Sequence, residues 1–278
     1  MQSIVVQESF QNLTIIQFKE MMLISSLKHE CEMSKNKEKK LTAGVLGGMG
    51  PLATVDFMSM VIDHCPIVTE EDHVRLLVDQ NPHIPNRQIV SNNKSKKVGS
   101  MLAEGAKKLE SAGVDFIVMP CNTAHMFSDE IKVAINIPFI HIVKETINEI
   151  TEYFPDKLSV GIMATTACLN AKIYQEGLNH KMKTCLLPDN HHQDECMKGI
   201  FSIKEGSKIS DPAVTLASVA NHLIDKGAEI IIAGCTEIPL VLEDKDLEVP
   251  LVSSTEVLAI KTIEYANHLK IKRNHYKE

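Results

Sequence analysis

The chain of 278 residues contains no tryptophan, and aromatic residues make up only 4% of it. Its formal net charge is −7. A negatively charged chain with so few aromatic side chains neither attracts a phosphate backbone nor offers a surface on which bases stack. We therefore expect no nucleic-acid partner.

Cysteine pairs at metal or redox spacing are also lacking. None of the seven cysteines forms a C-x-x-C pair, which argues against a zinc ribbon and a thioredoxin-like motif. Irregular cysteines in a chain of this size are typical of a reduced, cytoplasmic protein. His191, His192 and Cys196 resemble a metal-binding cluster, but they lie in a polar stretch, so we interpret them as a solvated helix start and predict no metal site.

Long apolar runs are missing as well. The runs within residues 1–40 are too short to span a bilayer and do not follow the pattern of a secretory signal, so we expect no membrane partner. We interpret residues 1–40 as an N-terminal extension that ends in a charged linker, Lys35–Lys40. The glycines at 47, 48 and 50 lack the spacing of either common nucleotide-binding loop.

From Leu41 onward, short β-branched apolar runs alternate with amphipathic stretches, which predicts an α/β fold with parallel sheets. The predicted strands are Ala43–Leu46, His73–Val78, Asp115–Met119, Pro138–His141, Leu158–Met163, Lys183–Leu187, Glu229–Ala233 and Pro250–Val252. The main predicted helices are Leu52–His64, Val98–Ser111, Ala213–Lys226 and Thr255–Leu269.

Two stretches of the chain repeat one pattern, AGVDFIVMPCNTAH (112–125) and KGAEIIIAGCTEIP (226–239). Their glycines lie 114 residues apart, and so do Cys121 and Cys235. A period this long indicates a duplicated domain rather than a solenoid. We predict two pseudo-symmetric three-layer α/β/α domains with mainly parallel four-stranded sheets, the first comprising residues 41–142 and 250–278 and the second residues 143–249.

Both matched cysteines directly follow a predicted strand, at the sheet edge where ligands bind in such folds. If the two edges face each other, Cys121 and Cys235 share one cleft. A helix start after each cysteine favours thiolate, and a thiol and a thiolate on opposite faces of a carbon can invert it by acid–base catalysis. No sequence motif suggests a pyridoxal cofactor.

Four further motifs carry a resemblance to a known family: GVLGGMGPLAT (44–54), NPHIPNR (81–87), MPCNTAH (119–125) and AGCTEIPL (233–240). With them the chain resembles the aspartate racemase branch of the cofactor-independent aspartate/glutamate racemases over about residues 41–267. Glu237 favours this branch, since glutamate racemases carry histidine there. The resemblance implies a homodimer that uses no cofactor and interconverts L- and D-aspartate.

The resemblance also implies roles for single residues. Cys121 and Cys235 become the catalytic acid/base pair, and Arg87 a ligand of a substrate carboxylate, for which its forked guanidinium is suited. Lys204 matches a lysine near the distal carboxylate. The remaining predicted substrate-binding residues are Met49, Asn122, Thr123, Thr165, Thr236 and Glu237. Cys168 stands where the family usually has threonine.

Other functions remain open at this stage. A racemase acting on both aspartate and glutamate is the nearest alternative, and a cis–trans isomerase of a dicarboxylate is more distant. A non-catalytic amino-acid-binding protein would not need both cysteines. A redox sensor would need Cys121 and Cys235 closer than a cleft of substrate width permits.

Overall fold

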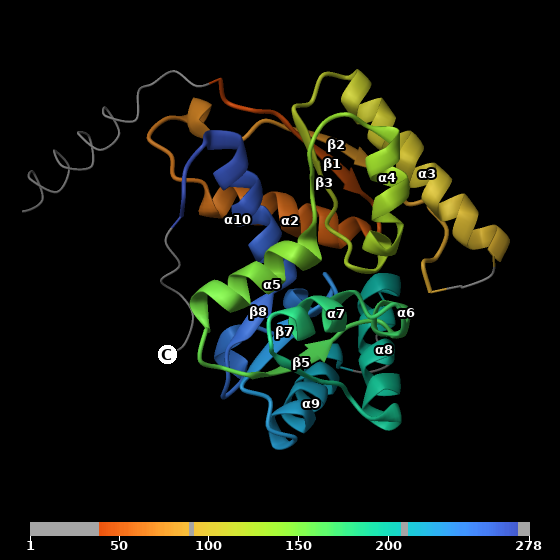
Figure 1. Cartoon of the computed structure of the whole chain (residues 1–278), viewed down its shortest axis with the longest axis vertical. Helices are drawn as coiled ribbons and strands as arrows, with labels where there is room; N and C mark the ends of the chain where they lie inside the picture. Colours follow the sequence, from red (N-terminus) through yellow and green to blue (C-terminus); the bar gives the residue numbers. More distant parts are fainter. Residues whose placement is uncertain (1–38, 89–91, 207–210, 272–278) are drawn as a thin grey trace, which may run out of the picture. The chain divides into compact units, whose positions relative to one another are not determined.

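Two parallel sheets organise the chain in a computed structural model that describes residues 39–88, 92–206 and 211–271 (Figure 1). The predicted extension at residues 1–40 lies outside these ranges except for its last two residues. From Lys40 onward the chain forms one compact unit. No helix in the described ranges is both long enough and apolar enough to cross a membrane.

The sheets share one topology. The first has the order β2-β1-β3-β4 and the second β6-β5-β7-β8, and every neighbouring pair is parallel. The strands are β1 (Ala43–Gly47), β2 (Leu76–Gln80), β3 (Phe116–Val118), β4 (Phe139–Ile140), β5 (Ser159–Met163), β6 (Thr184–Leu186), β7 (Ile230–Ala233) and β8 (Leu251–Ser253). All eight predicted strands are confirmed to within three residues, and the equal strand order confirms the pseudo-symmetric α/β fold.

Helices connect the strands, as expected for parallel sheets, which need long crossover connections. They are α2 (Pro51–His64), α3 (Asn92–Ser111), α4 (Ser128–Ala134), α5 (Ile142–Tyr153), α6 (Thr166–Asn170), α7 (Ile173–His180), α8 (Asn190–Glu205), α9 (Pro212–Asp225) and α10 (Ser254–Asn267). Short 3-10 segments are η1 (Glu70–Asp72), η2 (Thr123–Phe127), η3 (Ile238–Leu240) and η4 (Asp244–Asp246). Helix α3 begins before the predicted Val98, in a polar stretch that has no apolar periodicity.

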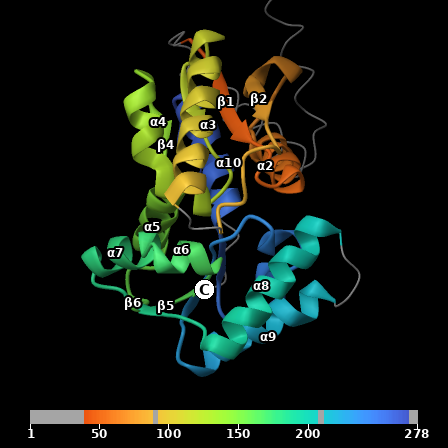
Figure 2. The ribbon, with the colours of Figure 1, turned by 90° about the vertical axis from the view of Figure 1, so that its right-hand side faces the viewer.

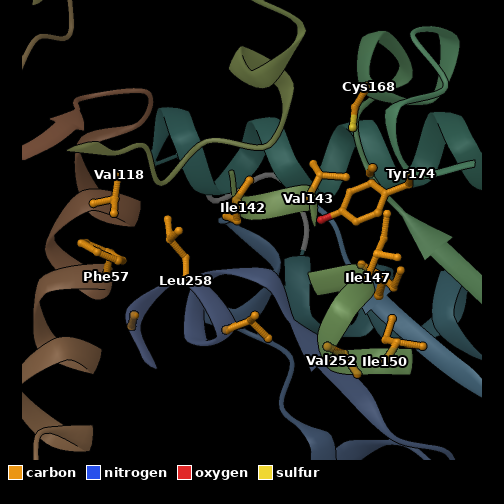
Figure 3. Packing of buried hydrophobic residues seen from close by; sticks show 14 of the residues in the cluster. Phe57, Val118, Ile142, Val143, Ile147, Ile150, Cys168, Tyr174, Val252 and Leu258 are labelled. Atoms are coloured by element: carbon orange, nitrogen blue, oxygen red, sulfur yellow. The ribbon is translucent and has the colours of Figure 1, made fainter. Parts of the chain in front are cut away.

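Three apolar clusters hold these layers together. The largest contains residues of both sheets and of the helices between them, including Phe57 of α2, Ile147 of α5 and Leu258 of α10 (Figure 3). A second cluster packs α3 and α4 on the other face of the first sheet, and a third packs α8 and α9 on the other face of the second. Each sheet is therefore covered on both faces, as in the predicted three-layer arrangement.

The last strand and the last helix lie in different layers. Strand β8 pairs with β7 in the second sheet, although the predicted boundary at residue 250 assigns it to the first domain. Helix α10 follows directly and packs against α2 and α5. The chain thus returns from the second sheet towards α2 only after β8. The domain boundaries proposed from the sequence stay predictions.

Candidate active site

The carboxyl ends of the two sheets meet through contacts between loops that follow strands. After β3, the Asn122 amide donates to Ser254 Oγ after β8 at 2.8 Å. The hydroxyls of Thr123 and Thr165, the latter after β5, share a hydrogen bond of 2.8 Å. A methyl group at Gly50, after β1, would lie 3.3 Å from Glu237 Oε1, after β7. The segments that follow these five strands thus converge on one region, which also contains Cys121 and Cys235.

The backbone at Cys121 is fixed by a hydrogen bond from His125. The His125 Nδ1–H donates to the Cys121 carbonyl at 2.8 Å, because Nε2 accepts from the Ile142 N–H at 3.2 Å and must be unprotonated. Burial, and then the charge of His141, hold the pKa of His125 well below its ordinary value. His125 is therefore a neutral group that fixes the backbone at Cys121 rather than a partner of its thiol.

Cys235 donates its thiol hydrogen to Glu237. The distance from Sγ to Glu237 Oε2 is 3.0 Å, and both side chains are buried. Burial raises the pKa of the Cys235 thiol well above its ordinary value, and the negative charge of Glu237 raises it further. The expected stabilisation of thiolate by a following helix is thus wrong for Cys235, because the segment after it, η3, has only three residues and a carboxylate lies nearer.

Lys204 forms an ion pair with the other oxygen of the Glu237 carboxylate. Its Nζ lies 3.2 Å from Glu237 Oε1. Burial lowers the pKa of Lys204, but electrostatic interactions with Cys235, Glu237 and Cys121 outweigh burial and raise it overall. The ammonium group is therefore positively charged and within electrostatic range of both thiols.

Arg87 provides a second cation nearby, and its positive charge acts to lower the pKa of Lys204. Its guanidinium donates to backbone carbonyls, at 3.1 Å to Met49, 3.4 Å to Ile84 and 3.2 Å to Pro85. The carbonyl of Met49, whose side chain is buried, thus anchors Arg87. Glycine is required beside it, because Gly48 has a φ of +90° and a Cβ there would lie 2.5 Å from the Asn81 backbone.

A buried chain of hydrogen bonds joins the segments that carry the two cysteines. Tyr174 of α7 donates to Asn122 Oδ1 at 2.6 Å, Asn122 donates to Ser254, and Ser254 donates to the Ala233 carbonyl at 2.8 Å. Asn122 follows Cys121, and Ala233 lies two residues before Cys235. The side chain of Asn122, a predicted substrate ligand, is therefore already engaged by the protein.

The other predicted contacts also have protein partners. Thr165 caps α6 by accepting from the Cys168 N–H at 3.3 Å, and Thr236 Oγ1 lies 3.5 Å from Glu237 Oε2. Cys168 is fully buried beside Tyr174 in the central cluster (Figure 3). Burial raises the pKa of Cys168 to about 12, and the charge of Cys121 contributes, so this thiol is un-ionised at neutral pH.

Three residues of this region were not predicted from the sequence. Tyr174 and Ser254 lack a motif of their own, and only the packing of α7 and α10 brings them to Asn122. Gln88 follows the NPHIPNR motif, and its Oε1 accepts from the Ala167 N–H at 3.1 Å, which ties this loop to α6. The position of Gln88 next to Arg87 is the one sequence signal that pointed to it.

A family model for Asp/Glu/hydantoin racemases matches residues 46–262 of the chain. The match covers most of the chain and includes every site residue described above. The chain belongs to the Asp/Glu/hydantoin racemase family. This confirms the family resemblance, and it makes the protein a member of a family of amino-acid racemases, which are isomerases acting on small substrates.

Individual relatives of this racemase agree with the family match. The broad specificity amino-acid racemase RacX of Bacillus subtilis (strain 168) is 33% identical over 226 residues, which cover 79% of this chain and 96% of RacX. An aspartate racemase of Picrophilus torridus has a TM-score of 0.72 and 29% identity, covering 81% of this chain and 94% of that one. Glutamate racemase isoform RacE1 of Bacillus anthracis has a TM-score of 0.60 at 18% identity, covering 83% of both chains, and shows the shared fold.

Proposed function

We propose that this racemase interconverts L- and D-aspartate by moving the α-proton between Cys121 and Cys235. The observation that carries the proposal is the hydrogen-bond chain from Asn122 through Ser254 to the Ala233 carbonyl, which ties together the two segments that carry the buried thiols. The match to an aspartate racemase fold supports the substrate class.

In the proposed reaction, one cysteine thiolate removes the α-proton from one face of the amino acid. The C–H electron pair stays on the α-carbon, and the second cysteine donates its thiol proton to the opposite face. The enantiomer is formed, and the two cysteines have exchanged thiol and thiolate. Both directions therefore use the same two groups.

Glu237 supports this exchange at Cys235. Because Oε2 accepts the thiol hydrogen at 3.0 Å, the carboxylate can take that proton when Cys235 must act as the base. When Cys235 is the acid, its raised pKa keeps the proton in place for donation. We assign Glu237 the role of a proton partner for Cys235.

The two cations are the proposed carboxylate ligands. Arg87 is fixed by three backbone carbonyls, and Lys204 is held by Glu237 until substrate competes for it. Charge-assisted hydrogen bonds of this type are the strong ones. A dicarboxylic amino acid fits because it brings two negative groups to two cations, with further contacts proposed from Met49, Asn122, Thr123, Thr165 and Thr236.

A broader substrate range is the second candidate. It is favoured by the similarity to RacX, which is named a broad specificity racemase. The chemistry at the cysteines would be the same. The two candidates differ in whether a substrate must carry a side-chain carboxylate that binds Lys204. As the resemblance implies, we further propose that the protein is cytoplasmic and forms a homodimer. Light scattering of the purified protein tests the dimer, and cell fractionation tests the location.

The test incubates the purified chain, without added cofactor, with single enantiomers of aspartate, glutamate, alanine and lysine, and follows the other enantiomer by chiral chromatography. Aspartate should react with a kcat/KM at least tenfold above the rest. Similar values for all four amino acids would replace the aspartate proposal by broad specificity. Binding without turnover of any enantiomer would indicate a non-catalytic amino-acid-binding protein.

A further inference from the structure

A cluster of metal-binding side chains lies at the surface of the second sheet's helical layer, where α8 begins and α9 ends. Asp189 precedes α8, His192 lies in its first turn, and His222 lies in the last turn of α9. One potential ligand atom from each of the three lies within 4.8 Å of the others. We propose that Asp189, His192 and His222 bind a divalent transition metal ion of the Zn²⁺ type.

The spacing of the donor atoms supports this proposal. Asp189 Oδ1 lies 2.8 Å from His192 Nδ1, and Asp189 Oδ2 lies 3.5 Å from His222 Nε2. In a tetrahedral site with bonds of about 2.0–2.1 Å, neighbouring donors are about 3.3 Å apart. The two distances lie on either side of that value, although they start from different oxygens of the carboxylate, so a metal ion can bind once side-chain movements bring one oxygen and the two nitrogens to this spacing.

The arrangement of the two rings sets the movement that is needed. The imidazoles of His192 and His222 stack with centroids 3.6 Å apart and planes at 9°. A shared metal ion lies near the plane of each ring, so the rings must tilt apart at the Asp189 end. Both side chains are partly exposed, at 25% and 19%, and have room to do so.

A nitrogen shielded from solvent lies beside the Asp189 carboxylate. His222 Nε2 is shielded from solvent and makes no hydrogen bond with any part of the chain that the structure describes. The Asp189 carboxylate lies 3.5 Å from it. An imidazole nitrogen in that situation gains a strong interaction when it becomes a metal ligand.

The donor types select the class of ion. Two imidazole nitrogens and one carboxylate oxygen suit Zn²⁺, Cu²⁺ or Ni²⁺, whereas Mg²⁺ and Ca²⁺ prefer oxygen ligands alone. Three protein ligands leave one tetrahedral position open. His192 and His222 line a surface hollow together with Asn221 and Asp225, so solvent or an oxygen of these neighbours can fill that position.

The structure also corrects which residues make up the metal-like cluster of the sequence. Cys196 of α8 is fully buried in the core, and His191 is exposed. His222 replaces them as the partner of His192, from a helix 30 residues further along the chain. Helices α8 and α9 pack side by side in both views, and this packing creates the cluster (Figure 2).

A metal ion here would clamp the start of α8 to the end of α9. Helix α8 carries Lys204 in its last turn, so the clamp would steady the helix that supplies a proposed substrate ligand. None of the three ligands is among the residues that meet at the thiols. The clamp should therefore raise thermal stability and leave racemisation possible after chelation.

The test measures Zn²⁺ binding to the full chain by calorimetry after treatment with a chelator. Cys121→Ser and Cys235→Ser are introduced together as the background, because the catalytic thiols are themselves zinc ligands. We expect one Zn²⁺ per chain, with affinity at least tenfold lower in His192→Ala, His222→Ala and Asp189→Asn. The control variant is His191→Ala, because His191 is the exposed neighbour of His192. It should bind Zn²⁺ like the background protein.

Asp189→Asn is the most informative variant, because asparagine keeps the helix cap but loses the carboxylate charge. Thermal melts of each variant without metal show that it is folded, and melts with Zn²⁺ should rise only where binding is retained. Binding that is absent from the background protein, or unchanged in both Asp189→Asn and His222→Ala, would overturn the proposal. Racemase activity of the native chain is assayed separately, so either result leaves the proposed function to its own test.

Discussion

The carboxylate of Glu237 joins Cys235 to Lys204, using a different oxygen for each. Oε2 accepts the Cys235 thiol hydrogen at 3.0 Å, and Oε1 lies 3.2 Å from the Lys204 ammonium. One buried side chain thus controls the proton of a proposed catalytic group and the charge of a proposed substrate ligand. The two roles can be separated by mutation.

Glu237→Gln tests the proton role. Loss of the carboxylate that can take the proton should lower kcat/KM for aspartate about 100-fold, in the range that acid–base groups contribute. The decrease must be equal in both directions, because the two enantiomers have equal free energy. With α-deuterated substrates, the isotope effect on kcat/KM should rise in the direction in which Cys235 removes the proton and fall in the other. Equal isotope effects in both directions would contradict this role.

Lys204→Met tests the substrate role. Removing the ammonium deletes a charge-assisted interaction of about 1.5–3 kcal/mol, so KM for aspartate should rise about 10- to 100-fold. The KM for alanine, which has no side-chain carboxylate, should change little. Lys198→Met is the matched control, because Lys198 is an exposed lysine of the same helix paired with Glu195. A KM that rises equally for aspartate and alanine would show that Lys204 does not bind the side-chain carboxylate of the substrate.

Tyr174→Phe tests the buried hydrogen-bond chain. The substitution leaves the buried Asn122 Oδ1 without its donor, which should cost about 1–3 kcal/mol in the free energy of unfolding. Because Asn122 follows Cys121, kcat should fall as well. A double-mutant cycle with Ser254→Ala, measured by urea unfolding, should give a coupling energy of about 0.5 kcal/mol or more, since both side chains act through Asn122. Additive effects would show that the chain is not a unit.

Two histidines, His125, which is buried, and His141, which is partly buried, predict loss of stability in mild acid. Burial lowers the pKa of His125 well below its ordinary value, and burial, with the charge of Lys132, lowers that of His141 to about 4. In the unfolded chain both titrate near about 6.5. Below that pH the unfolded state binds more protons than the folded state, so stability falls as pH drops from about 6.5 towards 4.

The expected slope is up to about 1.4 kcal/mol per pH unit for each histidine. Urea unfolding at pH 7, 6 and 5 measures it. His141→Gln should remove one histidine's share of the slope, and glutamine can still accept the Lys144 N–H that His141 accepts. A slope that is the same in His141→Gln and in the native chain would contradict the assignment.

The fold was largely predictable from the sequence because each strand is a short apolar run and the two halves repeat it. Cys121 and Cys235 could be singled out for the same reason. The start of α3 at Asn92 was not predictable, since its first turns are polar on all sides. The partners of Asn122, and the pairing of His192 with His222, depend on how separate helices pack, and no local spacing encodes such contacts.

The central claim is that two cysteines act on opposite faces of one carbon. Initial-rate racemisation of L-aspartate in heavy water tests it most directly, with product and remaining substrate analysed by mass spectrometry. We predict that the D-aspartate formed carries deuterium while the remaining L-aspartate stays protiated, that the reverse holds from D-aspartate, and that Cys121→Ala and Cys235→Ala each abolish racemisation. D-aspartate that retains the substrate's own proton, or activity surviving in either variant, would contradict the two-thiol mechanism.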